Sequence, residues 1–178
     1  GQHCDLALFD SQVSSLANVA MNFLCTGEVP RPLGDAHPSI VPYQSFPTAD
    51  RPLMIAVGND SQFAGLCRAL GEPRWADDPR FRGNPARVQH REMLVPMIAD
   101  KLTQHPRDHW LTVFGALEDG FPHGPIQDLG ELADDPQLRA RGLFTTMDDG
   151  ETPCLRSPIG LSRTPIRDYR RPPALGEH

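Results

Sequence analysis

The sequence lacks long hydrophobic runs and is almost without lysine, and both absences exclude classes of protein. No stretch approaches the roughly twenty apolar residues of a membrane-spanning helix, and Gly1 to Asp10 has neither the basic nor the apolar region of a secretory signal. The 17 basic residues include a single lysine, Lys101, and the formal net charge is -6. A nucleic-acid partner has no general electrostatic support, so we expect neither a nucleic acid nor a membrane as partner.

Cysteine is also scarce and unpaired. The four cysteines are widely scattered, form no C-x-x-C motif and sit among apolar residues, as buried free thiols do: Cys4, Cys25, Cys67 and Cys154. This usage indicates a reduced, cytoplasmic protein and argues against a disulfide-rich secreted one.

Common catalytic and cofactor motifs are missing too. There is no G-x-G-x-x-G after a strand pattern, no Walker loop, no G-x-S-x-G and no cysteine set for zinc. His105 and His109 stand four residues apart, but no third ligand is close in the sequence and Pro106 places the first outside a regular turn. We therefore expect no metal.

The remaining composition is that of a folded protein. With 178 residues, 39% of them hydrophobic and 22% charged, the chain can bury one good core or two small ones. Seven arginines lie between Arg139 and Arg171 against four acidic residues. Guanidinium groups suit phosphates and carboxylates, but a solvated tail explains the same run and is the favoured interpretation.

Both ends of the sequence look cut. Gln2 to Phe9 alternates like a strand, and Asp10 or Ser11 can cap a helix that then continues to Gly27. A strand and its helix cannot bury their apolar faces against each other alone. We expect most of their sheet to lie on polypeptide outside this sequence.

The segment from Pro30 to Phe63 is the most informative part of the chain. Its prolines fix φ and remove N–H donors, so the backbone here can join neither a helix interior nor a central strand: Pro30, Pro32, Pro38, Pro42 and Pro47. Large apolar side chains such as Phe46 need a surface to cover. We expect this segment to lie along a folded domain and to present Gly34, Asp35 and His37 in a fixed orientation.

A second group of elements follows. Leu53 to Val57 is typical of a covered strand, and Asn59 or Asp60 can cap the helix after it, which Gly71 ends. Further on, the pattern predicts these features: a turn capped by Asn84, a helix over 91–104 starting near Met93 with Pro96 in its first turns, a helix with Pro106 in its first turn, an irregular crossing over 120–126, a short helix beginning at Asp128, a helical turn over 136–141, and a hairpin of 143–147 with 152–155.

Two histidines lie on predicted irregular segments. For His123 in the crossing, a structural hydrogen bond is favoured over a catalytic role. His37 lies beside Asp35 on the rigid loop, where an imidazole could meet an acyl carbonyl or a carboxylate. A role for His37 in fixing the loop stays equally open.

Several blocks of sequence carry a family resemblance. In order they are GQHCDLALFDSQ, TGEVPRPLGDAHPSIVPYQSFPTAD, IAVGNDSQFAGLCRALG, DDPRFRGNPARVQHR, GFPHGPIQDL, DDPQLRARGL and RPPALGEH. Together they resemble successive blocks of the class III CoA-transferases, the family of formyl-CoA transferase, carnitine CoA-transferase and the acyl-CoA racemases. The PYQ, FPTAD and AVGNDSQF blocks are most similar to those of transferases that use dicarboxylic acids such as succinate.

The resemblance implies an α+β fold and a division of the chain. It implies one strand and helix of a Rossmann-like large domain (1–27), a linker with the active-site loop (28–50), a small α+β domain (51–160) and a return linker (161–178). It also implies an interlocked homodimer when the protein is intact.

The resemblance also implies where the chemistry lies. The family's nucleophile is an aspartate that attacks an acyl-CoA thioester and later carries coenzyme A itself. By comparison this aspartate precedes Gly1, so we expect no catalytic residue in this chain and no activity of the chain alone. Coenzyme A is implied as substrate, together with an acyl donor and a carboxylic acid.

One loop of this sequence matches the family's cover over the reactive anhydride. The candidate active-site loop is Gly34, Asp35, Ala36, His37 and Pro38. It is bulkier and more rigid than the glycine run of formyl-CoA transferase, which suggests that its shape and polarity select the acid.

Two other functions stay open from the sequence. One is a noncatalytic module that keeps the fold to bind CoA or a partner. The other is a piece of an acyl-CoA racemase, which needs a proton-transfer pair in place of a covalent carboxylate.

Overall fold

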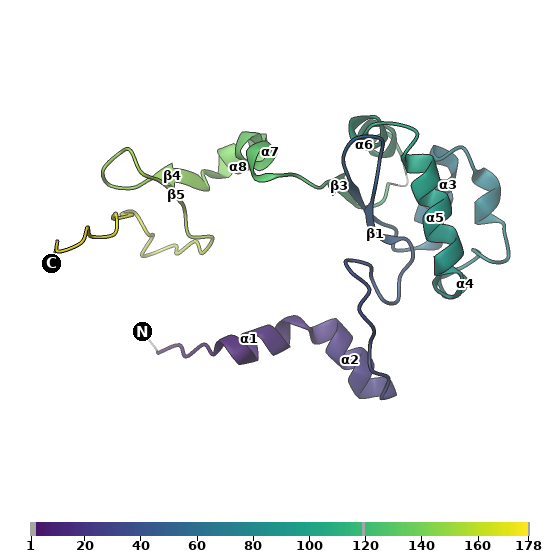
Figure 1. Ribbon diagram of the computed structural model, residues 1–178, viewed down its shortest axis with the longest axis horizontal. Helices are drawn as coiled ribbons and strands as arrows, with labels where there is room; N and C mark the ends of the chain where they lie inside the picture. The colour runs from purple at the N-terminus through teal and green to yellow at the C-terminus, as the bar shows by residue number, and fades with distance from the viewer. Residues whose placement is uncertain (1–2, 119, 178) are drawn as a thin grey trace. The chain divides into compact units, whose positions relative to one another are not determined.

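The computed structural model describes residues 3–118 and 120–177 and divides the chain into two compact units, one ending at Ile126 and the other beginning at Gln127 (Figure 1). Short helices and small antiparallel sheets make up both, an α+β arrangement as predicted. No helix in the described part of the chain is long and apolar enough to cross a membrane.

A three-stranded antiparallel sheet organises the first unit. Its order is β1 (Tyr43–Phe46), β2 (Leu53–Ala56), β3 (His123–Pro125), with Phe46 opposite Leu53 and Ile55 opposite His123. Leu53 and Ile55 of the central strand are fully buried, which confirms the predicted covered strand. Proline lies only at the margins of this sheet, because a residue without an N–H cannot serve a central ladder.

Two of these strands were not predicted. Tyr43–Phe46 lies within the segment expected to be a loop, and His123–Pro125 lies within the expected irregular crossing. Four consecutive residues between Pro42 and Pro47 keep their N–H groups, which is enough for an edge strand beside β2. The prediction excluded a central strand correctly and overlooked an edge strand.

Helices α3 (Asp60–Ala69), α4 (Asn84–Gln89), α5 (Arg91–Leu102) and α6 (Arg107–Gly115) and the 3-10 turn Pro73–Ala76 complete this core; Figure 1 shows α3, α5 and α6 beside the sheet. As predicted, Asn59 caps α3, its side chain accepting a 2.9 Å hydrogen bond from the Gln62 amide. Helices α3, α5 and α6 each bury an apolar face, with these residues among the buried ones: Phe63, Leu66, Leu94, Ile98, Trp110 and Phe114. The buried residue of α4 is Arg87.

Three helix starts differ from the prediction. α5 begins at Arg91 and continues through Pro96, whereas a start near Met93 was expected. Buried Leu94 and Ile98 hold this helix on both sides of Pro96, so packing outweighs the lost backbone bond. Pro106 is the N-cap of α6 and not a residue of its first turn, and Gly83 precedes α4 where Asn84 was expected to cap.

The beginning of the chain also differs. Residues 3–7 have no regular structure and Leu8 starts a helix, so the predicted strand over 2–9 is wrong for its described part. The expected single helix is broken at Leu16 into α1 (Leu8–Ser15) and α2 (Ala17–Thr26); it ends at Gly27 as predicted, with φ +74. A strand needs a neighbour for its backbone groups, and this stretch has none here.

Neither α1 nor α2 has a buried residue. Leu8 is 90% and Leu24 72% exposed. Cys4 and Cys25 are exposed as well, so the expectation of buried thiols is wrong for these two. Cys67 is buried, and burial raises the pKa of its thiol to about 12.

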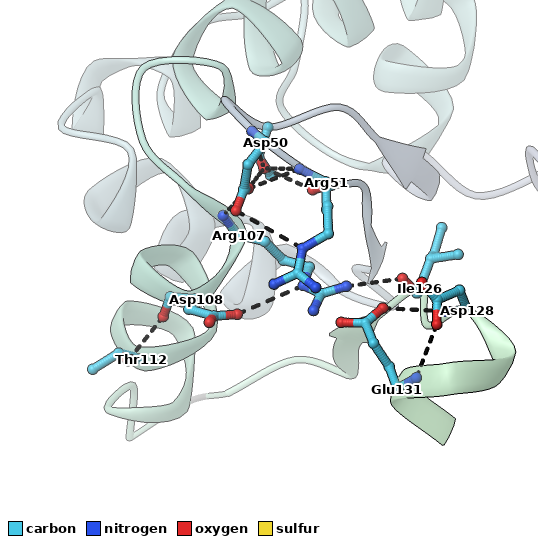
Figure 2. Close-up of polar contacts among 9 residues, drawn as sticks. Asp50, Arg51, Arg107, Asp108, Thr112, Ile126, Asp128 and Glu131 are labelled. Atoms are coloured by element: carbon cyan, nitrogen blue, oxygen red, sulfur yellow. Dashed lines mark hydrogen bonds and ion pairs between the residues drawn. The ribbon is translucent and has the colours of Figure 1, made fainter. Parts of the chain in front are cut away.

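The second unit contains α7 (Leu129–Asp134), α8 (Pro136–Arg141) and a hairpin of β4 (Phe144–Thr146) with β5 (Pro153–Leu155). These elements confirm the predicted helices and hairpin. Asp128 and Glu131 form a reciprocal capping box at the start of α7, with bonds of 2.8 and 3.1 Å (Figure 2). The seven arginines between Arg139 and Arg171 are all exposed.

A polar cluster ties the end of the proline-rich segment to α6. Oδ1 of Asp50 accepts hydrogen bonds from the backbone amides of Arg107 and Arg51, both at 2.7 Å, and lies 2.9 Å from the Thr48 hydroxyl (Figure 2). The Arg107 amide belongs to the first turn of α6, so Asp50 serves that helix as an acceptor that its own backbone cannot supply. The Arg107 side chain, 4% exposed, donates to the Ile126 carbonyl after β3 at 2.9 Å.

The Asp50 contacts predict a stability that depends on pH. The hydrogen bonds from the Arg107 amide and the Thr48 hydroxyl lower the pKa of Asp50 to about 2. Because the folded-state pKa is depressed, the stabilisation is complete above the unfolded pKa near 4 and is lost as the pH falls toward 2. In urea denaturation, Asp50→Asn should lower the unfolding midpoint at pH 6, and its gap from the parent protein should narrow between pH 4 and pH 2.5.

The matched control is Asp77→Asn, at an exposed position beside the turn Pro73–Ala76. At every pH, the unfolding midpoint of Asp77→Asn should stay close to that of the parent protein. A constant gap between Asp50→Asn and the parent across this range would contradict the role of the ionised Asp50 carboxylate.

Candidate functional site

The candidate loop is folded back against the outer edge of β1. Gly34 has φ +64, a left-handed conformation that favours glycine, and the Ala36 amide closes a turn onto the Leu33 carbonyl at 3.2 Å. The His37 amide then donates to the Tyr43 carbonyl at 2.9 Å, and the Asp35 carboxylate accepts from the Ser45 amide at 3.0 Å. The loop thus pairs with the edge of the sheet that no strand covers in the described structure.

The His37 imidazole has a defined position and tautomer. Its Nδ1 accepts a 3.1 Å hydrogen bond from the Ser39 amide, and its ring stacks on Tyr43 with centroids 5.2 Å apart. Because Nδ1 accepts the hydrogen bond from the Ser39 amide, it must carry a lone pair, and the proton of the neutral ring is therefore on Nε2. Half-buried His37 therefore offers an Nε2–H donor in a fixed direction.

Asp35 serves a different purpose in the loop. Hydrogen bonds from Ser45, chiefly through its side chain, lower the pKa of the Asp35 carboxyl. The carboxylate is ionised at neutral pH and already accepts a bond from the sheet edge. Its geometry suits fixing the loop and does not suit general-acid chemistry.

Side chains of α4 and α5 bond the backbone of the candidate loop and of the residues that follow it as far as Val41. The sequence did not indicate these contacts. Asn84 donates to the Ser39 carbonyl at 2.7 Å and accepts from the Val41 amide at 3.1 Å. Arg91 donates to the His37 and Pro38 carbonyls, both at 2.9 Å. The only signal in the sequence is the helical spacing of polar residues after Gly83, which equally fits a solvated face.

The other histidine candidates have structural partners. His123 Nδ1 lies 2.8 Å from the Phe121 carbonyl, the kind of hydrogen bond that was predicted. His105 and His109 stack with centroids 4.2 Å apart. Within residues 3–118 and 120–177, no three potential ligands of the histidine, cysteine or carboxylate kind gather where they could hold a metal ion.

The structure brings Gly34, Asp35, Ala36, His37 and Pro38 together in one turn beside β1. Their assignment as an active-site loop stays a prediction. Chemically, the turn presents a neutral N–H donor beside an aromatic face and a carboxylate that is already engaged. Such a surface suits an anionic or carbonyl oxygen better than a proton-abstraction step.

The two hydrogen bonds predict opposite tautomers at two histidines. His37 Nδ1 accepts from an amide and should be the Nε2–H tautomer, whereas His123 Nδ1 faces a carbonyl and should be the Nδ1–H tautomer. Long-range ¹H–¹⁵N correlation spectra at pH 8 distinguish the two forms. Ser39→Pro removes the amide donor and serves as the control at His37; the same tautomer at both rings would overturn this assignment.

Comparison with known proteins matches the whole chain to one family. The family model described as CoA-transferase family III covers residues 1–178. The chain is 44% identical over its full length to a protein from Agrobacterium fabrum named succinate–glutarate CoA-transferase, of which it covers 45%. It is 35% identical, again over its full length, to mouse succinyl-CoA:glutarate CoA-transferase, of which it covers 41%.

Solved structures agree with these matches. A CAIB/BAIF family protein from Brucella suis matches with a TM-score of 0.80 and 41% identity, over 100% of this chain and 46% of that one. Rv3272 from Mycobacterium tuberculosis matches with a TM-score of 0.76 at 21% identity, which supports the fold alone. The chain spans less than half the length of the relatives it matches. It belongs to CoA-transferase family III.

Proposed function

We propose that this chain is part of an enzyme that moves coenzyme A from an acyl-CoA to a carboxylic acid, with a dicarboxylic acid as the preferred acceptor. The observation that carries the proposal is the 44% identity, over the entire chain, to a protein named succinate–glutarate CoA-transferase. Other relatives at 32–36% identity are named for oxalate and mesaconate, which are also dicarboxylates. The relatives named here are transferases, which favours this function over a noncatalytic module or a racemase.

The proposed reaction proceeds through a covalent enzyme carboxylate. An aspartate oxygen attacks the thioester carbonyl, the C–S bond breaks, and the products are a mixed anhydride and the CoA thiolate. The thiolate attacks the aspartyl carbonyl, which releases the first acid and leaves aspartyl-CoA. The acceptor carboxylate and the thiolate then repeat these two steps in reverse order, forming the new acyl-CoA and restoring the aspartate. No metal or redox partner is needed for this balance.

We assign the nucleophilic aspartate to polypeptide preceding Gly1 and no catalytic residue to this chain. The match covers 45% of the Agrobacterium relative, which leaves room for the remaining site. In the proposed enzyme, residues 1–27 belong to a larger domain, and residues 28–50 link it to a small domain over residues 51–160. Residues 161–178 form the return linker. The exposed apolar residues of α1 and α2 support a covering partner for this segment.

The loop from Gly34 to Pro38 is proposed to cover the anhydride and contact the acid. Water must be excluded while the anhydride exists, because hydrolysis would end the transfer. Its fixed backbone and the Nε2–H of His37 suit a cover that donates a hydrogen bond to a carboxylate. The intact enzyme is proposed to be a cytoplasmic homodimer.

The covalent intermediate gives a direct test. The full-length polypeptide, incubated with succinyl-CoA and digested in acid, should yield a peptide carrying CoA on an aspartate that precedes Gly1. The 178-residue chain, treated alike, should carry none and should turn over no thioester. Turnover by the short chain would overturn the placement of the nucleophile.

The role of His37 is tested by its removal. In the full-length enzyme, His37→Ala should lower kcat/KM for the dicarboxylate about tenfold, the effect of one hydrogen bond to a charged group, and change the KM for acyl-CoA by less than about twofold. His123→Ala, which alters a histidine bonded to a backbone carbonyl, is the control and should spare the acid preference. Equal losses toward both substrates would count against a contact between His37 and the acid.

A further inference from the structure

The loop that carries His37 depends on donors from outside itself. Pro38 and Pro42 have no N–H, so the stretch between them has few backbone bonds of its own to make. Its carbonyls at 37, 38, 39 and 41 instead accept from side chains of α4 and α5. Three residues supply these donors, spaced three and four apart: Asn84, Arg87 and Arg91.

All of these contacts are made to the loop backbone. Asn84 bonds the Ser39 carbonyl and the Val41 amide, and Arg91 bonds the His37 and Pro38 carbonyls with one nitrogen, Nη2. Arg87 Nε donates to the Val41 carbonyl at 2.8 Å. Main-chain contacts at successive positions fix the course of the loop whatever side chains it carries.

These contacts constrain the His37 imidazole indirectly, through the backbone of residues 37 and 39. Arg91 holds the carbonyl of His37 itself, and Asn84 holds the carbonyl of Ser39, whose amide bonds the imidazole at Nδ1. On the opposite side, Tyr43 accepts from the His37 amide and stacks on the ring. The backbone that carries the imidazole is therefore held by side chains of α4 and α5, and the ring itself contacts Tyr43 of β1.

We propose that Asn84, Arg87 and Arg91 are positioning residues that hold the backbone of residues 37–41 and so aim the Nε2–H of His37 at the acid substrate. The aiming role rests on the proposed function of the loop. The holding role rests on the hydrogen bonds described above, and the two roles are measured separately.

Asn84 and Arg91 give a cleaner test than Arg87. Arg87 is 1% exposed, bonds the Phe81 carbonyl at 3.1 Å and Asp60 at 2.8 Å, and lies 4.5 Å over the Phe63 ring. Its removal would disturb the core as well as the loop. Asn84 and Arg91 are half-buried, and the contacts described for them go to the loop.

The experiment compares Arg91→Ala, Asn84→Ala and Arg91→Lys in the full-length enzyme, with Arg68→Ala as the matched control on the exposed face of α3. Hydrogen exchange is followed at the amides of His37, Ser39 and Ser45. Arg91 touches none of these amides, so their exchange reports on the loop and not on a lost bond. Arg91→Ala should accelerate it about tenfold, Arg91→Lys less, and Arg68→Ala not at all.

Kinetics then tests the aiming. Arg91→Ala and Asn84→Ala should raise the KM for the acid and lower kcat, while the KM for acyl-CoA changes less than about twofold. Unchanged exchange in both alanine variants would overturn the holding role. Faster exchange with unaltered kinetics would overturn the aiming role.

If the wild-type enzyme transfers no CoA, the proposed function is overturned, and the aiming role with it. Hydrogen exchange would still decide the holding role. If Arg91→Ala fails to fold, Asn84→Ala provides the same two readouts, with Ser39 as the reporting amide for the loop.

Discussion

The shortage of backbone donors in the proline-rich segment is the constraint around which the first unit is arranged. A buried or packed carbonyl must find a donor, and proline supplies none. The loop carbonyls are satisfied by side chains of α4 and α5, and the outer edge of β1 by loop residues in turn. Further along the chain, the Asp50 side chain accepts a hydrogen bond from the Arg107 amide in the first turn of α6. The segment is thereby fixed at both ends to helices that follow it in the sequence.

Features that depend on local chemistry could be predicted from the sequence. The covered strand β2, the Asn59 cap of α3, the Asp128 cap of α7 and the hairpin of β4 and β5 each follow from a few neighbouring residues. The family was also recognisable, because ordered blocks of sequence carry far more information than any single motif. The structure and the comparisons confirm these predictions.

Features that depend on a distant partner could not be predicted. The two edge strands exist because β2 lies between them, and a run of four residues shows no such neighbour in its own sequence. The stretch before α1 alternates like a strand yet has no sheet to join in the described chain. Asn84 and Arg91 bond residues more than forty positions away, so their spacing alone could not separate them from a solvated helix face.

The hydrogen bonds from α4 and α5 to main-chain atoms have a consequence for how this loop can vary in sequence. Since α4 and α5 hold carbonyls and an amide, the side chains at 36 and 39, which take part in none of the hydrogen bonds described for the loop, can be exchanged over generations while the loop follows the same path. Under the proposed role of the loop in contacting the acid, point substitutions there would change acid recognition one position at a time, without a new scaffold. A backbone held in this way lets the fold of the loop stay the same while its unbonded side chains change.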